Sequence, residues 1–161
     1  MTMQEFARRE EPLREKLFRT ALAILGSPSL AEEALDEAVF RGLLACAFLR
    51  DPIHFNAWLT RILLNVCIAE LRRKKRETSL ETLPEQEAEV FDAVPLRQAM
   101  GQLPRQLRDV VVLRFVSGYT LAETAEILKI PPGTAASRQR RALALLRLEL
   151  GEEEGEYEKP K

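Results

Sequence analysis

Apolar residues recur every three or four positions over most of the chain, which is the spacing of amphipathic helices. Leu13, Leu17, Ala21 and Leu25 follow this spacing, and Gly26 comes directly after them. Because glycine readily adopts the left-handed conformation that ends many helices, the pattern predicts a first helix that stops at Gly26. Since no segment shows the strict alternation of a half-buried strand, we expect an all-α fold.

Two further helices are predicted in the first half of the chain. Ser29 and Glu32 have the spacing of a capping box, and the apolar pattern then continues to about Leu49. The expected apolar positions of this second helix are Ala31, Leu35, Val39, Phe40, Leu43, Leu44 and Phe48. A third helix is expected from near Phe55 to the basic run at 72–76, whose charge suits the C-terminal end of a helix dipole.

The segment at 77–95 is acidic, contains two prolines and shows no sustained period, so it reads as a linker with room for a short helical piece. The fold class that we expect is therefore all-α, with two small helical domains joined by an acidic linker. The predicted division is a first domain at 1–76, the linker at 77–95, a second domain at 96–150 and an acidic tail at 151–161.

The second domain is expected to contain four helices. A short one is predicted at 96–103, and a longer one follows Pro104 and stops at Ser117. Thr120 and Glu123 form a capping box for a brief third helix. After the turn "KIPPG", a final helix is expected at about 134–150, which makes a helix-turn-helix with the helix before it.

Charge changes sign along the chain although the formal net charge is only −1. Residues 1–76 carry a net +3, residues 77–95 carry six acids and no bases, and residues 96–150 carry nine bases against four acids. Two basic blocks separated by an acidic strip are typical of a protein that binds a polyanion through two regions.

The composition excludes several classes of protein. An apolar content of 46% is ample for a folded core. The chain lacks a long apolar run, and its N-terminus is charged, so we expect a cytoplasmic protein. Cys46 and Cys67 lie within apolar helical patterns and are expected to be buried free thiols. Since the sequence has no P-loop, dinucleotide loop or metal-ligand cluster, we expect no enzyme, no cofactor and no small-molecule substrate.

The final helix carries a polar stripe at helical spacing. Thr134, Ser137, Arg138 and Arg141 fall on one face, whereas Ala135, Ala142 and Leu146 take another. A second helix with hydroxyls and guanidiniums near its N-terminus is the layout by which helix-turn-helix units enter the major groove. The alternative is an ordinary surface helix with an arginine-rich, solvated face.

Two sets of motifs resemble a known family. The stretch "LPRQLRDVVVLRFVSGYTLAETAEILKIPPGTAASRQRRALALLRLEL" resembles the fourth conserved region of bacterial sigma factors. In the first domain, "AEEALDEAVF" resembles the acidic core-binding stretch of that family, and "HFNAWLTRILLNVCIAELRRKKR" resembles its second conserved region. With only these two regions and a short linker, the chain resembles the extracytoplasmic-function sigma factors.

The resemblance implies a role for each motif. The second domain would read the minus-thirty-five promoter element as duplex, through Thr134, Ser137, Arg138, Arg140 and Arg141. The first domain would dock on core RNA polymerase through Glu33, Asp36, Glu37 and Phe40. It would also hold the melted minus-ten strand through Asn56, Arg61, Asn65, Arg72, Arg73 and Lys74, with the loop at 49–56 as the candidate base pocket.

Simpler roles stay open for several of these residues. The acidic residues near position 33 can merely solvate a helix, and Asn65 can be a buried amide with satisfied hydrogen bonds. Trp58, between Leu59 and Ile62, is expected to anchor the core of its domain. The acidic linker could thread toward polymerase or be a solvated tether.

The family implies an alternative sigma factor that directs core polymerase to promoter DNA, assists strand opening and catalyses no covalent reaction. It also implies an anti-sigma factor as a partner, which is often membrane-anchored and could hold the protein at a membrane. One rival is a stand-alone helix-turn-helix regulator that binds DNA without polymerase. Another rival is a helical adaptor for other proteins, which would leave both motif sets unexplained.

Overall fold

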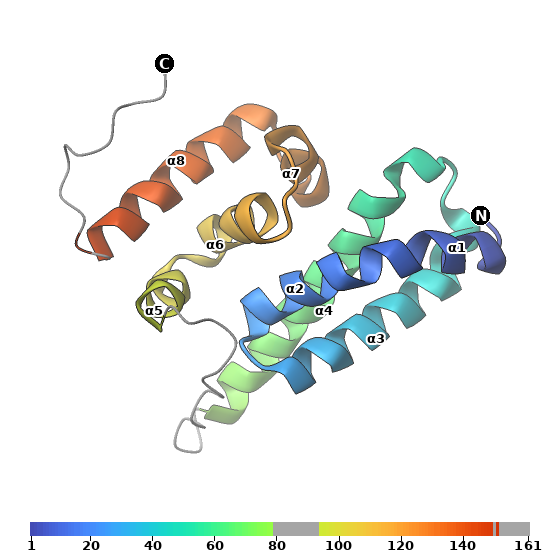
Figure 1. Cartoon of the computed structure of the whole chain (residues 1–161), viewed down its shortest axis with the longest axis horizontal. Coiled ribbons are helices and arrows are strands. Elements are labelled where there is room, and N and C mark those ends of the chain that lie inside the picture. Colours follow the sequence, from blue (N-terminus) through green and yellow to red (C-terminus); the bar gives the residue numbers. More distant parts are fainter. Residues whose placement is uncertain (79–93, 150, 152–161) are drawn as a thin grey trace.

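In the computed structural model, residues 1–78, 94–149 and 151 are described, and the regular elements among them are helices (Figure 1). The N-terminal bundle consists of α1 Met3–Glu10, α2 Arg14–Leu25, α3 Pro28–Ala45 and α4 Phe55–Thr78. The C-terminal group consists of α5 Val94–Gln102, α6 Arg105–Val111 with the π-helical turn Val112–Val116, α7 Leu121–Leu128 and α8 Pro132–Glu149. The predicted all-α fold is thereby confirmed. Most of the predicted linker and tail, at 79–93 and 152–161, lie outside the described residues.

The helix ends of the N-terminal bundle differ in part from the sequence prediction. Gly26 does end α2, in the left-handed conformation with φ of 70°. The predicted capping box was wrong, because Ser27 rather than Ser29 caps α3: its hydroxyl accepts a hydrogen bond from the Leu30 N–H at 3.4 Å. Pro28 occupies the first turn of α3, where its fixed φ suits the helix and its missing N–H costs nothing.

Aromatic side chains from α1 and α4 fill the centre of the N-terminal bundle. Phe6 meets Phe55 edge to face, with ring centroids 5.5 Å apart, and it meets Trp58 in the same way at 6.4 Å. Leu59 and Leu63 of α4 are fully buried beside them. Trp58 is half-buried against this core, as predicted. Such edge-to-face pairs add to the stabilisation from burial alone.

Both cysteines lie in the core as free thiols, as predicted. Burial raises the pKa of the Cys67 thiol to about 12, with smaller contributions from the carboxylates of Asp109 and Glu70. Since the thiolate is the reactive form, Cys67 is protected from reaction at neutral pH as long as the protein is folded.

In the C-terminal group, the helix-turn-helix is built from local signals that the sequence shows. Gly118 adopts φ of 78° after the π-helical turn, and the predicted capping box of Thr120 and Glu123 forms in both directions. Lys129 ends α7 in the left-handed conformation, with φ of 52°. On α8, Ala135 and Ala142 are fully buried, so the predicted inner face of this helix is confirmed.

The two helical groups share one hydrophobic core. Val112, Leu113, Tyr119 and Ile127 of the C-terminal group belong to the same cluster of buried residues as the centre of the N-terminal bundle. The π-helical turn Val112–Val116 contacts α2, and α7 contacts α4, so the C-terminal group lies along one side of the bundle (Figure 1). The structure therefore holds the two groups closed against one another.

Two buried hydrogen bonds cross this contact. The hydroxyl groups of Thr20 and Ser117 lie 2.5 Å apart, and those of Thr60 and Tyr119 lie 2.7 Å apart. Lys16 adds a cation–π contact, with its Nζ 4.4 Å from the centroid of the Tyr119 ring. Because a buried hydroxyl without a partner costs free energy, these pairs fix the register of the two groups as well as their contact.

The packing of α3 on the core gives a first prediction. A Cβ atom on Gly42 would lie 2.9 Å from Leu59 Cδ1 and 3.0 Å from the Phe6 ring. We expect Gly42→Ala to lower the free energy of unfolding by about 1–3 kcal/mol, because overpacking of a closed core outweighs the better helix propensity of alanine. Urea unfolding followed by circular dichroism measures this change.

Gly101→Ala in α5 is the matched control, because a Cβ atom there would meet nothing within 4 Å. We expect it to leave stability unchanged or to raise it by up to about 1 kcal/mol. Equal effects of the two substitutions would contradict the packing that we describe around Gly42.

Candidate nucleic-acid interface

The α7–α8 hairpin is held rigid by one arginine. Arg114, in the π-helical turn, donates from Nε to Gln139 Oε1 of α8 at 2.9 Å and from Nη1 to the Tyr119 carbonyl at 2.7 Å. Glu123 closes the N-terminus of α7, and its hydrogen bond to the Thr120 N–H lowers the pKa of its carboxyl. Helix α8 is thus oriented by contacts that lie behind its outward face.

The candidate duplex-reading residues lie on α8 with different exposures. Ser137, Arg140 and Arg141 are exposed, whereas Thr134 and Arg138 are half-buried. The exposed three are accessible to a large partner in this arrangement. Arg138 instead lines a cleft between the two helical groups.

The candidate minus-ten residues follow α4, and the structure separates them into two groups. Arg61 and Asn65 lie in the middle of the helix and line the cleft, and Asn65 is exposed there, so its alternative role as a buried amide is wrong. The others lie near the two helix ends, and among them Asn56, Arg72 and Arg73 are exposed while Lys74 is half-buried. Arg73 donates to Glu70 Oε1 at 2.7 Å.

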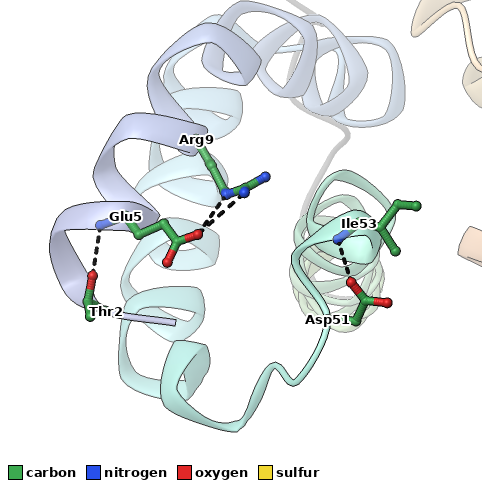
Figure 2. A network of polar contacts seen from close by, with 5 residues as sticks. All are labelled: Thr2, Glu5, Arg9, Asp51 and Ile53. Atoms are coloured by element: carbon green, nitrogen blue, oxygen red, sulfur yellow. Dashed lines mark hydrogen bonds and ion pairs between the residues drawn. The ribbon is translucent and has the colours of Figure 1, made fainter.

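The loop predicted as a base pocket, 49–56, is a short helical turn with an exposed edge. Figure 2 shows Asp51 turned back on its own loop, where Oδ1 accepts from the Ile53 N–H at 3.1 Å. The Ile53 side chain is 80% exposed. His54 reaches across to α7, with Nδ1 2.5 Å from Glu126 Oε1. The loop therefore contacts the helix-turn-helix in this arrangement.

Figure 2 also shows how α1 begins beside this loop. The Thr2 hydroxyl accepts from the Glu5 N–H at 3.1 Å, and Arg9 pairs with Glu5 one turn later. These contacts lie on the outer surface, where an ion pair contributes little to stability. They cap a helix whose role is to place Phe6 in the core.

The cleft between the groups has a volume of about 340 Å³ and an apolar floor with a polar rim. The floor consists of Leu64, Ile68, Ile127, Leu128 and Ile130. The rim consists of Arg61, Asn65, Arg105, Gln106, Asp109 and Arg138. Candidate residues for two different promoter elements thus line the same cleft. The sequence alone did not indicate that they lie close together.

Asp109 is the carboxylate of this rim, and it is buried. Burial raises the pKa of its carboxyl, and the neighbouring Arg105, Arg108 and Arg138 offset this only in part. Arg105 Nε lies 3.9 Å from Asp109 Oδ2, which is a long ion pair. The positive charge of the cleft is therefore only partly compensated.

The candidate polymerase-docking residues share the outer face of α3. Glu33, Asp36 and Glu37 are exposed, and Phe40 is 56% exposed. The same face continues with Leu44 and Phe48, which are 66% and 83% exposed. These three residues, which the sequence pattern places among the apolar positions of this helix, therefore lie on an exposed face rather than in the core.

Helix α3 is also shorter than the sequence pattern predicts. The helix stops at Ala45 and gives way to a short 3₁₀ turn, Cys46–Phe48, rather than continuing to Leu49. The buried residues of α3 are mostly small: Ala31, Ala34, Ala38 and Gly42, with Leu35 as the one large side chain. The wide apolar pattern of this segment therefore covers both a buried face and an exposed one.

Comparison with known proteins agrees with this geometry. A family model described as Sigma-70 region 2 matches residues 11–77, and one described as Sigma-70, region 4 matches residues 93–146. The RNA polymerase sigma-E factor of Streptomyces coelicolor is 31% identical over 156 residues, which cover 93% of this chain and 86% of that protein. The chain therefore belongs to the extracytoplasmic-function sigma factors.

Two other proteins extend the comparison. The ECF RNA polymerase sigma factor SigM of Mycobacterium tuberculosis is 32% identical over 126 residues, which cover 75% of this chain but 64% of SigM. The sigma factor RpoE of Bartonella quintana, solved in complex with the anti-sigma factor NepR, is 21% identical. It superposes with a TM-score of 0.75 and covers 93% of this chain and 99% of its own, so it shares the fold.

The role of Arg114 gives a second prediction. Arg114→Met keeps the aliphatic stem but leaves the Tyr119 carbonyl and Gln139 without their donor. We expect a loss of about 1–3 kcal/mol in the free energy of unfolding, because hydrogen bonds to a charged donor are lost in a half-buried place. Arg140→Met, on the exposed face of α8, is the control and should change stability by no more than about 0.5 kcal/mol. Equal losses in the two variants would disprove the bracing role.

Proposed function

We propose that this protein is an alternative sigma factor that directs core RNA polymerase to specific promoters and assists their opening. The observation that carries the proposal is that both sigma regions match in order along one chain, at residues 11–77 and 93–146. The protein would act by binding alone and would catalyse no covalent reaction. Its partners would be core RNA polymerase, promoter DNA and an anti-sigma factor.

Helix α8 would read the minus-thirty-five element as duplex. The polar stripe of α8 lies on a hairpin that Arg114 holds rigid through its hydrogen bond to Gln139. A rigidly held helix with a polar face is suited to enter the major groove. Arg138 has the side chain to fork onto guanine, while Thr134 and Ser137 near the helix N-terminus suit phosphate oxygens. Arg140 and Arg141 would add charge neutralisation along the backbone.

Helix α4 would engage the melted minus-ten strand. Asn56, Arg61, Asn65, Arg72, Arg73 and Lys74 supply donors along a 24-residue helix that is long enough to follow several nucleotides. The neighbouring loop at 49–56 exposes Ile53, an apolar surface on which an unstacked base could rest.

The outer face of α3 would dock on polymerase. The charges of Glu33, Asp36 and Glu37 suit a basic partner, and Phe40 gives an apolar anchor at the edge of that acidic stripe. Helix α3 lies on the side of the bundle away from the C-terminal group (Figure 1), and these side chains are exposed, so the face is accessible in the closed arrangement.

Binding to both promoter elements requires the two helical groups to separate. The elements are about 25 base pairs apart by their names, which is roughly 85 Å of duplex at about 3.4 Å per pair. A compact chain of this length is only about 40 Å across, and here Arg61 and Arg138 line the same cleft. Residues 79–93 are long enough to permit separation, since an extended chain of that length spans about 50 Å.

The protein would act in the cytoplasm, and an anti-sigma factor could hold it at a membrane. Among the residues that the structure describes, no helix is both long enough and apolar enough to span a bilayer. A stand-alone regulator using the same hairpin is the alternative. It would not need the acidic and apolar face of α3.

Run-off transcription with purified core polymerase on genomic fragments tests this function. We expect promoter-dependent transcripts that core polymerase alone does not produce, at salt low enough to preserve phosphate contacts. A chain that binds duplex DNA but adds no transcript to core polymerase would support the stand-alone regulator instead.

The same assay tests the reading helix. On a promoter identified in this way, Arg138→Ala should weaken promoter binding by about 1–3 kcal/mol if the guanidinium contacts a base. The loss should be larger for the cognate promoter than for one changed at the minus-thirty-five element. An equal loss on both would assign Arg138 to the phosphate backbone.

A further inference from the structure

The cleft between the two helical groups carries a cluster of like charges. Three arginines line it against one carboxylate. Arg61 comes from α4 of the N-terminal bundle, whereas Arg105 and Arg138 come from α6 and α8 of the C-terminal group. Closing the two groups therefore brings cations together at their contact, which by itself opposes closure.

The arginines have little internal compensation. Arg61 Nη1 is buried and makes no hydrogen bond to any residue that the structure describes. Asp109 is the one carboxylate among the lining residues, and its Oδ2 lies 3.9 Å from Arg105 Nε, which is a long ion pair. A buried guanidinium nitrogen without an acceptor, such as Nη1 of Arg61, is costly, and a bound anion would supply that acceptor.

The shape and chemistry of the cleft select the kind of anion. Its volume of about 340 Å³ lies at the low end of the usual range of ligand sites, roughly 300–1,000 Å³. Guanidinium groups present paired donors that match phosphate oxygens, and the amides of Asn65 and Gln106 on the rim offer further donors. The apolar floor, with Ile127 and Ile130, can accept an uncharged body attached to the phosphate.

We propose that this interdomain cleft binds a small phosphate-bearing anion between Arg61 on one wall and Arg105 and Arg138 on the other. Because the two walls belong to different helical groups, the bound anion stabilises the closed arrangement. By linkage, any state in which the groups separate then binds the anion more weakly. The consequence for promoter binding rests on the proposed function, whereas the anion site itself does not.

Isothermal titration of the full chain with inorganic pyrophosphate, at constant ionic strength, tests the site. We expect one site per chain. Arg61→Gln and Arg105→Gln should each weaken binding at least about tenfold, because each removes a charge-assisted donor pair. Arg19→Gln, an exposed arginine of α2 outside the cleft, is the matched control for net charge and should bind like the unmodified chain.

Two outcomes would overturn the proposal. The first is an affinity that is equal in all three variants, because this would mean diffuse attraction to a charged surface. The second is the absence of pyrophosphate binding to chains whose circular dichroism shows them to be folded. Run-off transcription without added pyrophosphate does not depend on either outcome. A failure of the anion site is therefore distinguishable from a failure of the sigma function.

A second arm separates the two sources of phosphate groups. A short single-stranded oligonucleotide is titrated against the same variants. The oligonucleotide could bind more tightly than pyrophosphate and lose this binding in Arg105→Gln, as pyrophosphate does. That result would assign the cleft to nucleic acid and overturn the small-anion assignment. Binding of pyrophosphate that the oligonucleotide does not displace would support it.

The linkage is tested by thermal unfolding. Pyrophosphate should raise the melting temperature of the unmodified chain and of Arg19→Gln, since a ligand specific to the folded, closed state stabilises it by mass action. It should raise the melting temperature of Arg61→Gln and Arg105→Gln much less. The same rise in all of them would contradict a bridging anion.

Discussion

The buried contact between Tyr119 and Thr60 ties the C-terminal helices to the N-terminal bundle, and much of the remaining structure follows from it. The Tyr119 side chain is only 2% exposed, and its hydroxyl lies 2.7 Å from that of Thr60 in α4. Its carbonyl accepts from Arg114, which in turn holds Gln139 of α8. Burial also raises the pKa of Tyr119, so the phenol stays protonated and able to donate. One residue therefore links α8, the proposed reading helix, to α4, the helix proposed to hold the opened strand.

This link creates a conflict between stability and function. Closure buries apolar surface from Val112, Leu113 and Ile127 in the core of the bundle, which stabilises the compact chain. The same closure places Arg61 and Arg138 in one cleft, where they could not reach the two separate promoter elements proposed for them. Under the proposed function, binding to polymerase and DNA would have to supply the free energy to separate a contact that is apolar at its centre and cationic at its rim.

Structural features whose signals lie close together in the sequence could be predicted, whereas features that depend on distant residues could not. The helix-turn-helix was predicted because its signals lie within a few residues: the capping box of Thr120 and Glu123, and the buried face of α8. The cap of α3 was misplaced because both Ser27 and Ser29 have suitable side chains, and the position of Pro28 decides between them.

The relation between the two groups could not be predicted from spacing. The hydroxyl pair of Thr20 and Ser117 joins residues 97 positions apart in the chain, and no periodicity indicates it. Likewise, the apolar pattern of Phe40, Leu44 and Phe48 could not show that these side chains are exposed, because an apolar surface for a partner has the same sequence pattern as an apolar surface for the core. The sequence motifs were thus sufficient to name the residues of the candidate site. Only the three-dimensional structure shows that several of them line one cleft.

We propose that the free chain is closed and would open when it acts at a promoter. A distance measurement between spin labels on Arg19→Cys in α2 and Ala144→Cys in α8 tests this most directly, since both positions are exposed and the native cysteines are buried. We expect one narrow distance distribution in the free chain and an increase of tens of ångströms, within the roughly 85 Å between elements, once polymerase and promoter are bound. An unchanged distance in the promoter complex, or a broad distribution in the free chain, would contradict this proposal.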